Sequence, residues 1–269
     1  MLDIFDKIYV VSLTSSDDRR AHIRRHFSEI GIENYSFHDA CDGESDEVQA
    51  LFSEGLVKKY PPCFRCGRLE CDRPDCNNTL IPSQVAVFAT YLKLWKVISQ
   101  TNERVLICED DVVFHPWWRD VLQKVSTQIK AGNLSFAASK PSLLRLGWAL
   151  SAEHTNETPF SINNTLRMSN PCHAITSAYA RELLKEFRGV NHTADVFQHR
   201  LAEVSKTHAH TVFPPIAYEL SWSTGALDSL IHPKNIRAQY LLSQGETEEA
   251  EIYRNKVQHH ATKVSHKKP

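Results

Sequence analysis

The amino-acid sequence predicts an α/β fold in which a mostly parallel sheet carries helices on both faces. Residues 8–13, IYVVSL, form a short apolar run rich in β-branched residues, which is typical of a buried strand. The turn TSSDDRR and a helical repeat of Ile23, Phe27 and Ile30 follow, and YSFHDACDG then has the pattern of a second strand. This β-turn-α-β order is the opening of a doubly wound parallel sheet.

The same alternation returns after one interruption. Residues 44–82 hold a cysteine cluster and four prolines, and we expect them to form an insertion. A helix from Ser83, the strand RVLIC, a helix after Pro116, the strand SLLRLG, and the strand and helix of CHAITSAYARELLKEF follow in turn. We therefore assign residues 1–240 to one domain and residues 241–269 to a charged C-terminal tail.

Composition excludes several classes of protein. The chain has 269 residues, 42% hydrophobic and 23% charged, and its formal net charge of -1 gives no reason to expect nucleic acid as a partner. No apolar run approaches the roughly 18 residues that a transmembrane helix needs. The opening MLDIFDKIYVVSL carries acidic residues where a secretory signal would be basic. These features predict a cytoplasmic protein with no transmembrane segment.

The seven cysteines support a reducing compartment, because their number is odd and Cys108 lies inside an apolar strand. Four of them are clustered in CFRCGRLECDRPDC. Four thiolates with a leading C-x-x-C suit tetrahedral zinc, which would order an otherwise polar insertion. Two disulfides, or free surface thiols, are the alternatives. The expected zinc ligands are Cys63, Cys66, Cys71 and Cys76.

Three adjacent carboxylates, Glu109, Asp110 and Asp111, follow the strand RVLIC directly. Like charges at this spacing raise one another's pKa and cost free energy. Ligands of open parallel sheets bind at the carboxyl ends of the strands. A Mn²⁺ or Mg²⁺ ion there would relieve the repulsion, since such ions take one or two carboxylates together with phosphate oxygens. The alternative is a solvated acidic turn that caps the helix after Pro116.

Three blocks of sequence occur in an order that is characteristic of one enzyme family. They are IYVVSLTSSDDRRAHI with GIENYSFHDACDG, then VLICEDDVVF, and then SNPCHAITSAYARELL with HTADVFQHRL, and together they span roughly residues 5–235. The chain resembles glycosyltransferase family 25, which includes lipo-oligosaccharide and collagen galactosyltransferases with a GT-A nucleotide-sugar fold. The resemblance implies inverting transfer of a sugar, commonly galactose, from a UDP-sugar to a glycan or protein acceptor.

The resemblance also assigns metal ligands. A departing nucleoside diphosphate gains negative charge, which a bound Mn²⁺ or Mg²⁺ stabilises as a Lewis acid. We expect Asp111 to be the direct ligand, with Glu109 or Asp110 contacting metal-bound water or ribose. His232 is a weaker candidate for a further ligand, with a surface histidine as the alternative.

Further residues are expected to contact donor and acceptor. Arg19 and Asp42, near the first βα turn, are candidates for nucleotide-sugar binding, although Arg19 could equally form a structural ion pair. Inverting transfer needs one general base at the acceptor hydroxyl, and Asp195 matches the family's acidic position. The alternative role for Asp195 is a helix N-cap. Glu219 is the replacement base if Asp195 is not catalytic.

The chain departs from the family in the helix before the carboxylates. Family members usually place a Gly-Cys and a Ser-His pair there, whereas this chain has LIPSQVAVFATYLKLW, with Val87 and Ala89 to Tyr91 at those positions. This departure favours the rival hypothesis of a non-catalytic relative that binds carbohydrate or protein. A nucleotidyltransferase is a third hypothesis, which the lack of a Gly-rich phosphate loop opposes.

Overall fold

The computed structural model describes residues 2–58 and 80–224, together with residues 226, 227, 229 and 245. Three predictions concern residues outside this part of the chain. They are the zinc site at Cys63, Cys66, Cys71 and Cys76, the ligand His232, and the charged tail of residues 241–269 apart from Gly245.

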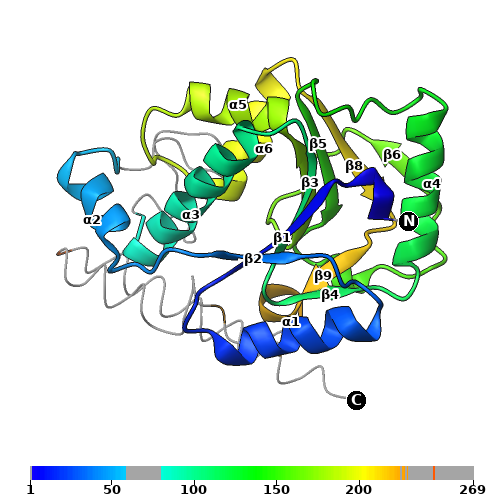
Figure 1. The fold of residues 1–269 in the computed structure, drawn as a ribbon, viewed down its shortest axis with the longest axis horizontal. Coiled ribbons are helices and arrows are strands. Elements are labelled where there is room, and N and C mark those ends of the chain that lie inside the picture. Colours follow the sequence, from blue (N-terminus) through cyan, green and yellow to red (C-terminus); the bar gives the residue numbers. More distant parts are fainter. Residues whose placement is uncertain (1, 59–79, 225, 228, 230–244, 246–269) are drawn as a thin grey trace.

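One seven-stranded sheet forms the centre of the molecule, in the order β2-β1-β3-β7-β5-β8-β6 (Figure 1). Five strands run in one direction, while β7 and β6 run against their neighbours. The predicted α/β fold with a mostly parallel sheet is therefore confirmed. The strands are β1 (Lys7–Ser12), β2 (Ser36–Asp39), β3 (Arg104–Glu109), β5 (Ser142–Gly147), β6 (Ser161–Asn163), β7 (Cys172–Thr176) and β8 (His208–Phe213).

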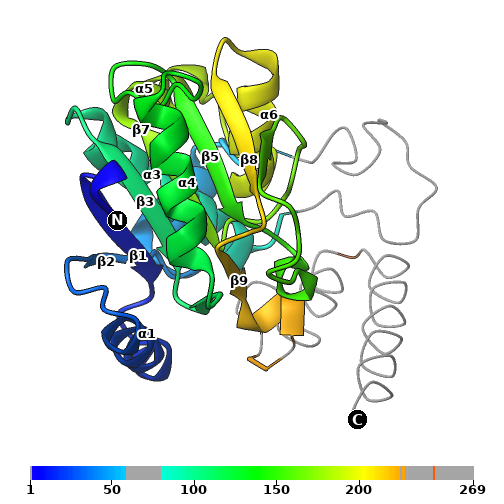
Figure 2. The same cartoon turned by 90° about the vertical axis from the view of Figure 1, so that its right-hand side faces the viewer.

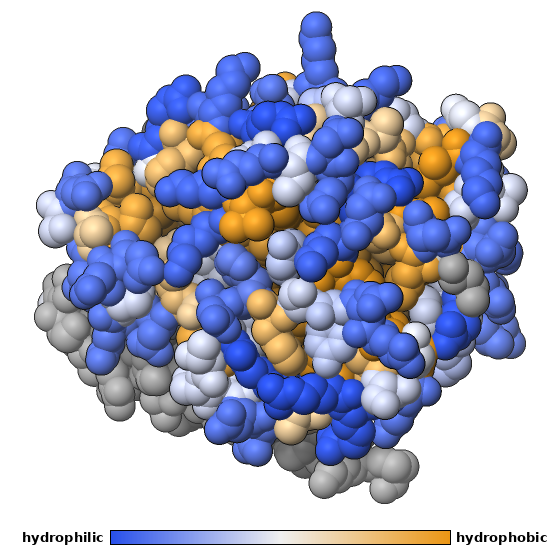
Figure 3. All heavy atoms as spheres, viewed as in Figure 1, coloured by the Kyte–Doolittle hydropathy of each residue, from blue (hydrophilic) through white to orange (hydrophobic). Residues whose placement is uncertain are grey.

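Helices cover both faces of this sheet, as expected (Figures 1 and 2). On one face, α1 (Asp17–Glu29) and α4 (Trp118–Lys130) bury Phe27 and Leu122 in the first hydrophobic core. On the other face, α3 (Pro82–Ser99), α5 (Ser177–Glu186) and α6 (Ala194–Val204) form the second core around Trp95. None of the helices in the described ranges is long and apolar enough to cross a bilayer. Figure 3 shows polar side chains over much of one face, with apolar side chains visible between them.

The start of the expected insertion is attached to the second core. Helix α2 (Asp46–Ser53) lies within residues 44–58 and packs on α3, and its Val48 is fully buried. Beyond α2, the amide of Lys58 donates to the carbonyl of Val190 at 3.0 Å. This segment therefore has its own helix and its own backbone bonds to the α5–α6 region.

A two-stranded ribbon of β4 (Val112–Phe114) and β9 (Ala217–Glu219) extends the carboxylate turn. The antiparallel register pairs Val112 with Glu219, so the residue after Asp111 lies beside Glu219. The ribbon can approach β5 because residue 147 is glycine: a Cβ there would lie 2.6 Å from the carbonyl oxygen of Ala217. Two acidic positions that are about a hundred residues apart in the sequence are thus brought together by backbone pairing.

Two histidines of α1 satisfy the outer edge of β4. Asp111 O and His115 N bond to Leu220 and Ile216, which flank β9, so the alternate residues of β4 direct their backbone groups away from β9. His22 Nε2 lies 3.1 Å from Val112 O, and the Phe114 amide donates to His26 Nε2 at 2.9 Å. A carbonyl only accepts, so His22 is protonated at Nε2, whereas His26 must be unprotonated there.

Acidification should therefore weaken this edge. Burial, and secondly His22, lower the pKa of His26 below its ordinary value of 6.5. As pH falls below 6.5 the unfolded chain takes up the proton first, so this contribution to stability is present above 6.5 and is lost as pH falls through the folded pKa. Glutamine at position 26 can accept from Phe114 N but does not titrate. Between pH 7.5 and 5, the free energy of unfolding should fall more for wild type than for His26→Gln in urea titrations.

The control for this comparison is His26→Phe. At pH 8 it leaves the Phe114 amide without an acceptor and should lose about 1–3 kcal/mol, whereas His26→Gln should lose less. Parallel pH profiles for wild type and His26→Gln would show that His26 does not accept this hydrogen bond.

Candidate active site

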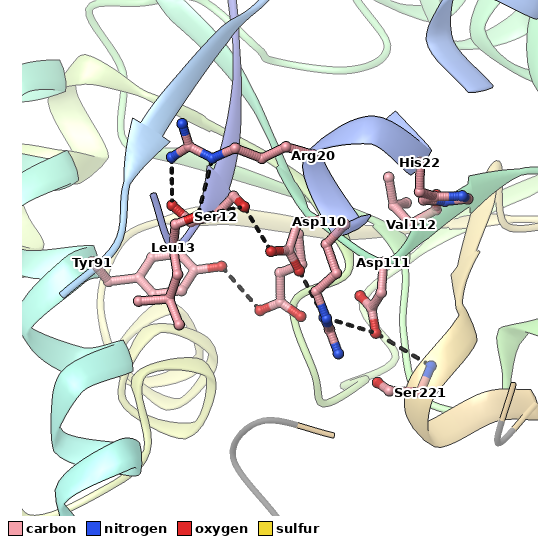
Figure 4. Close-up of polar contacts among 11 residues, drawn as sticks. Ser12, Leu13, Arg20, His22, Tyr91, Asp110, Asp111, Val112 and Ser221 are labelled. Carbon is pink, nitrogen blue, oxygen red and sulfur yellow. Dashed lines mark hydrogen bonds and ion pairs between the residues drawn. The ribbon is translucent and has the colours of Figure 1, made fainter. Parts of the chain in front are cut away.

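Asp110 is held at the carboxyl ends of two neighbouring parallel strands. The register pairs Val11 of β1 with Glu109 of β3, so the next residues, Ser12 and Asp110, also lie side by side. Ser12 Oγ donates to Asp110 Oδ2 at 2.8 Å (Figure 4), and Arg19 Nη1 donates to Asp110 Oδ1 at 2.7 Å. Both oxygens of Asp110 are thus engaged by protein donors, and the Arg19 side chain is 14% exposed.

Asp111 is held more loosely. Its Oδ2 accepts from the amide of Ser221 at 3.2 Å (Figure 4) and lies 3.9 Å from Arg19 Nη1. The backbone of the same residue accepts from the Leu220 amide at 3.0 Å. Arg19 therefore contacts both aspartates, and its positive charge offsets much of the repulsion between them. Arg19, in the first turn of α1, therefore allows the two aspartates to lie next to each other.

Glu109 is in a different environment from its two neighbours. The hydroxyl of Tyr91, on α3, donates to Glu109 Oε1 at 3.3 Å. Burial raises the pKa of Glu109 well above its ordinary value, and four further carboxylates add to the shift: Asp111, Glu219, Asp195 and Asp110. Four other carboxylates in the described part of the chain are thus close enough to Glu109 to act on it electrostatically.

The antiparallel strand β7 brings a second loop to the same edge. Because β7 runs against β3, the residues before it lie beside the end of β3, and the Glu109 amide donates to Pro171 O at 3.1 Å. In this loop Ser169 has φ +76°, in the left-handed region that few non-glycine residues occupy. Its amide donates to Asp195 Oδ2 at 3.0 Å, and its hydroxyl donates to Glu219 Oε2 at 3.2 Å. Ser169 therefore bridges two carboxylates.

The two bridged carboxylates come from different elements. Asp195 lies in the first turn of α6, whose N-cap is Thr193, so the alternative of Asp195 as the N-cap is wrong. Glu219 ends β9 and is 4% exposed. Burial, and then Asp111, raise the pKa of Glu219 to about 7. Its second oxygen, Oε1, is buried and has no hydrogen-bond partner among the described residues.

Of the predicted site residues that the structure describes, all but Asp42 meet at this edge. Asp42 is exposed, and its Oδ1 accepts from the Glu44 amide at 2.9 Å within its own turn. Residues that the sequence analysis did not assign complete the site. Tyr91 is one of the residues by which its helix departs from the family, and its hydroxyl contacts Glu109. The residues that the structure brings together are Ser12, Arg19, Tyr91, Glu109, Asp110, Asp111, Ser169, Asp195 and Glu219.

Within the described residues, no three His, Cys, Asp or Glu side chains are placed so that they could hold a metal ion. A cation bound partly through the phosphates of a ligand needs only one or two carboxylates from the protein. Of the two adjacent aspartates, Asp111 is the one with an oxygen to offer, because both oxygens of Asp110 already accept from Ser12 and Arg19.

The contacts predict that Asp110 and Asp111 contribute unequally to stability. Asp110→Asn replaces a charge-assisted bond to Arg19 and should lower the free energy of unfolding by about 2–3 kcal/mol. Asp111→Asn removes one of several repelling charges and should leave stability within about 0.5 kcal/mol of wild type, or raise it. Urea unfolding at pH 7.5 without divalent metal measures both. Equal losses in the two variants would contradict this division.

The chain is similar in sequence to proteins of one family. Residues 5–198 match the family model described as "Glycosyltransferase family 25 (LPS biosynthesis protein)". The lipooligosaccharide biosynthesis protein lic2B of Haemophilus influenzae is 25% identical over 245 residues, which cover 89% of this chain and 82% of that protein.

Two human proteins match a shorter part of the chain. Procollagen galactosyltransferase 2 is 27% identical over 133 residues, covering 49% of this chain and 20% of that protein. The protein named inactive glycosyltransferase 25 family member 3 is 28% identical over 135 residues, covering 49% of this chain and 21% of that protein. The match thus spans about a fifth of the length of these human relatives.

Proposed function

The chain belongs to glycosyltransferase family 25, and from this premise we propose that it moves a sugar, galactose in the first instance, from a UDP-sugar to a hydroxyl of a glycan or protein acceptor, with inversion. The observation that carries the proposal is the division of the carboxylates into two groups. Asp110 and Asp111 form one group with Arg19, and Asp195 and Glu219 form another, bridged by Ser169. Inverting transfer has the same two requirements: charge control at the leaving group and a base at the acceptor.

The first group suits the diphosphate side of the reaction. The atoms that could bind a metal in this group are carboxylate oxygens, which Mn²⁺ and Mg²⁺ prefer as ligands. The surplus of negative charge around Glu109 also favours a cation. Asp111 would hold the ion, and Glu109 would contact its water shell. When bound, the ion would supply Lewis-acid stabilisation of the departing diphosphate. Arg19 keeps Asp110 in place and presents a guanidinium, a good phosphate partner, beside Asp111.

The second group suits proton removal. In a single displacement, the acceptor oxygen attacks the anomeric carbon as the bond from that carbon to the UDP oxygen breaks. The proton of the acceptor hydroxyl passes to one carboxylate, Asp195 or Glu219. A pKa of about 7 makes Glu219 a competent base near neutral pH. Asp195 remains the base that the family resemblance implies, and the two can be separated by mutation.

Nucleotide binding tests the diphosphate side. Asp111→Asn should abolish Mn²⁺-dependent UDP binding, because an amide is a poor ligand for a hard cation in place of a carboxylate. Isothermal titration calorimetry with UDP, with and without Mn²⁺, makes the measurement. Asp42→Asn is the matched control, since Asp42 is exposed and bonded within its own turn. UDP affinity that is unchanged in Asp111→Asn would remove the metal assignment.

Two isosteric variants identify the base. Asp195→Asn and Glu219→Gln can each still accept from Ser169, so both should keep their contacts and their UDP affinity. Whichever carboxylate is the base should lose at least about a hundredfold in transfer rate when it is replaced. Product formation from UDP-galactose at matched enzyme stability is the measurement. If both variants transfer within a few-fold of wild type, neither carboxylate is the base.

A non-catalytic role is the second candidate, because one human relative carries a name that describes it as inactive. Hydrolysis assayed across a panel of nucleotide sugars, with and without Mn²⁺, discriminates the two. UDP binding without hydrolysis or transfer would favour the non-catalytic candidate.

Structural zinc at the cysteine cluster stays a prediction, and its role would be to order the insertion.

A further inference from the structure

Beneath the site lies a buried arginine that is not used by the proposed reaction. Arg145, on β5, is 2% exposed, and its Nε donates to His199 Nδ1 at 3.1 Å. Among the described residues no carboxylate lies within ion-pair distance of it, and its Nη2 has no hydrogen-bond partner. A guanidinium that is buried without a counter-ion is costly. A hydrophobic residue would fill the same position at a lower free-energy cost, so the presence of a guanidinium here indicates a function.

The contact with Arg145 determines where His199 carries its proton. A guanidinium donates hydrogen bonds and accepts none, so His199 Nδ1 must offer its lone pair. The proton of the neutral ring is then on Nε2, which lies 3.4 Å from the carbonyl oxygen of Ser169. Burial, and secondly the charge of Arg145, lower the pKa of His199 well below its ordinary value. His173, opposite Arg145 on β7, has a pKa lowered to about 4 by burial, so it is neutral as well.

Ser169 is the point at which this chain of contacts reaches the carboxylates. Its backbone is held at φ +76°, in the left-handed region that is unfavourable for residues other than glycine. Each of its polar groups contacts a different side chain: the carbonyl faces His199, the amide faces Asp195, and the hydroxyl faces Glu219. If φ of Ser169 left the left-handed region, the amide would turn relative to the carbonyl, and the contacts with Asp195 and His199 could not both be kept.

We propose that Arg145 and His199 are positioning residues: by fixing His199 as a donor to the Ser169 carbonyl, they keep Ser169 in the conformation that fixes Asp195 and Glu219 relative to each other. The catalytic consequence rests on the proposed function, whereas the structural claim does not. Both residues are buried, so in this proposal neither is a catalytic residue that contacts the substrate. Displacing a reacting group by about 1 Å can cost about a hundredfold in rate, which is the reason to keep such a support under a general base.

The structural claim can be tested without any activity. Long-range ¹H–¹⁵N correlation spectra of wild type at pH 7 should show His199 protonated at Nε2 and not at Nδ1. Arg145→Lys retains a donor and should preserve this tautomer, whereas Arg145→Met should not fix it and should shift the Ser169 amide resonance. A wild-type His199 that is protonated at Nδ1, or on both nitrogens, would overturn the proposal, and so would an unmoved Ser169 amide in a folded Arg145→Met.

The catalytic consequence is tested with a matched pair at position 199. Glutamine can place its amide donor near the position of Nε2, and asparagine can place its acceptor near the position of Nδ1. His199→Gln should therefore keep transfer within about threefold, whereas His199→Asn should lower kcat about tenfold to a hundredfold with unchanged UDP affinity. Losses that are equal in both variants and follow their thermal stability would make the role purely structural and overturn the catalytic part.

Failure of the proposed function gives a different result. If the wild-type chain binds UDP but transfers no sugar, the glycosyltransferase proposal fails. The tautomer of His199 and the Ser169 amide shift would still decide whether the two residues hold Ser169.

Discussion

Repulsion among carboxylates is the constraint around which this edge of the sheet is built. Five acidic side chains meet there, and each contact that holds them also limits the free-energy cost of bringing them together. Arg19 supplies positive charge to one group, backbone amides and hydroxyls supply hydrogen bonds, and burial favours the protonated form of Glu109. The result is a site in which the pKa values of Glu109 and Glu219 are raised above the ordinary value of a glutamate. Such shifts allow chemically identical groups to take separate roles.

The direction of one strand explains how these groups are assembled. If β7 were parallel to β3, the residues before it would lie at the opposite edge of the sheet. Because it is antiparallel, Ser169 reaches the same edge as Glu109, and α6 then starts close enough for Asp195 to join it. The β4–β9 ribbon adds Glu219 by pairing with the residue that follows Asp111. At this site, therefore, residues that are far apart in the sequence lie close together in space.

Sequence reasoning predicted the fold class and several of the site positions, because apolar periodicity and strand ends are local properties. The strand SLLRLG was recognised, and the structure has it as Ser142–Gly147, although nothing in the pattern indicated that Arg145 would be buried. The three-residue strands β4, β6 and β9 were not predicted, since so short a segment has no measurable period. Ser169 was missed because its role depends on a left-handed backbone and on the direction of the following strand. Neither of these properties is encoded in a short run of residues.

The histidine pair on α1 has a consequence for how copies of this chain meet one another. An unpaired strand edge is a template for another chain, and within the described residues β4 pairs with a strand, β9, on one edge only. On its other edge, His22 and His26 occupy a carbonyl and an amide that a foreign strand would need. The two imidazole rings thus make hydrogen bonds that a neighbouring strand would otherwise make, and they present no unpaired backbone to a further strand. Protection of this kind limits aggregation at the ribbon, and it lasts only while His26 remains neutral.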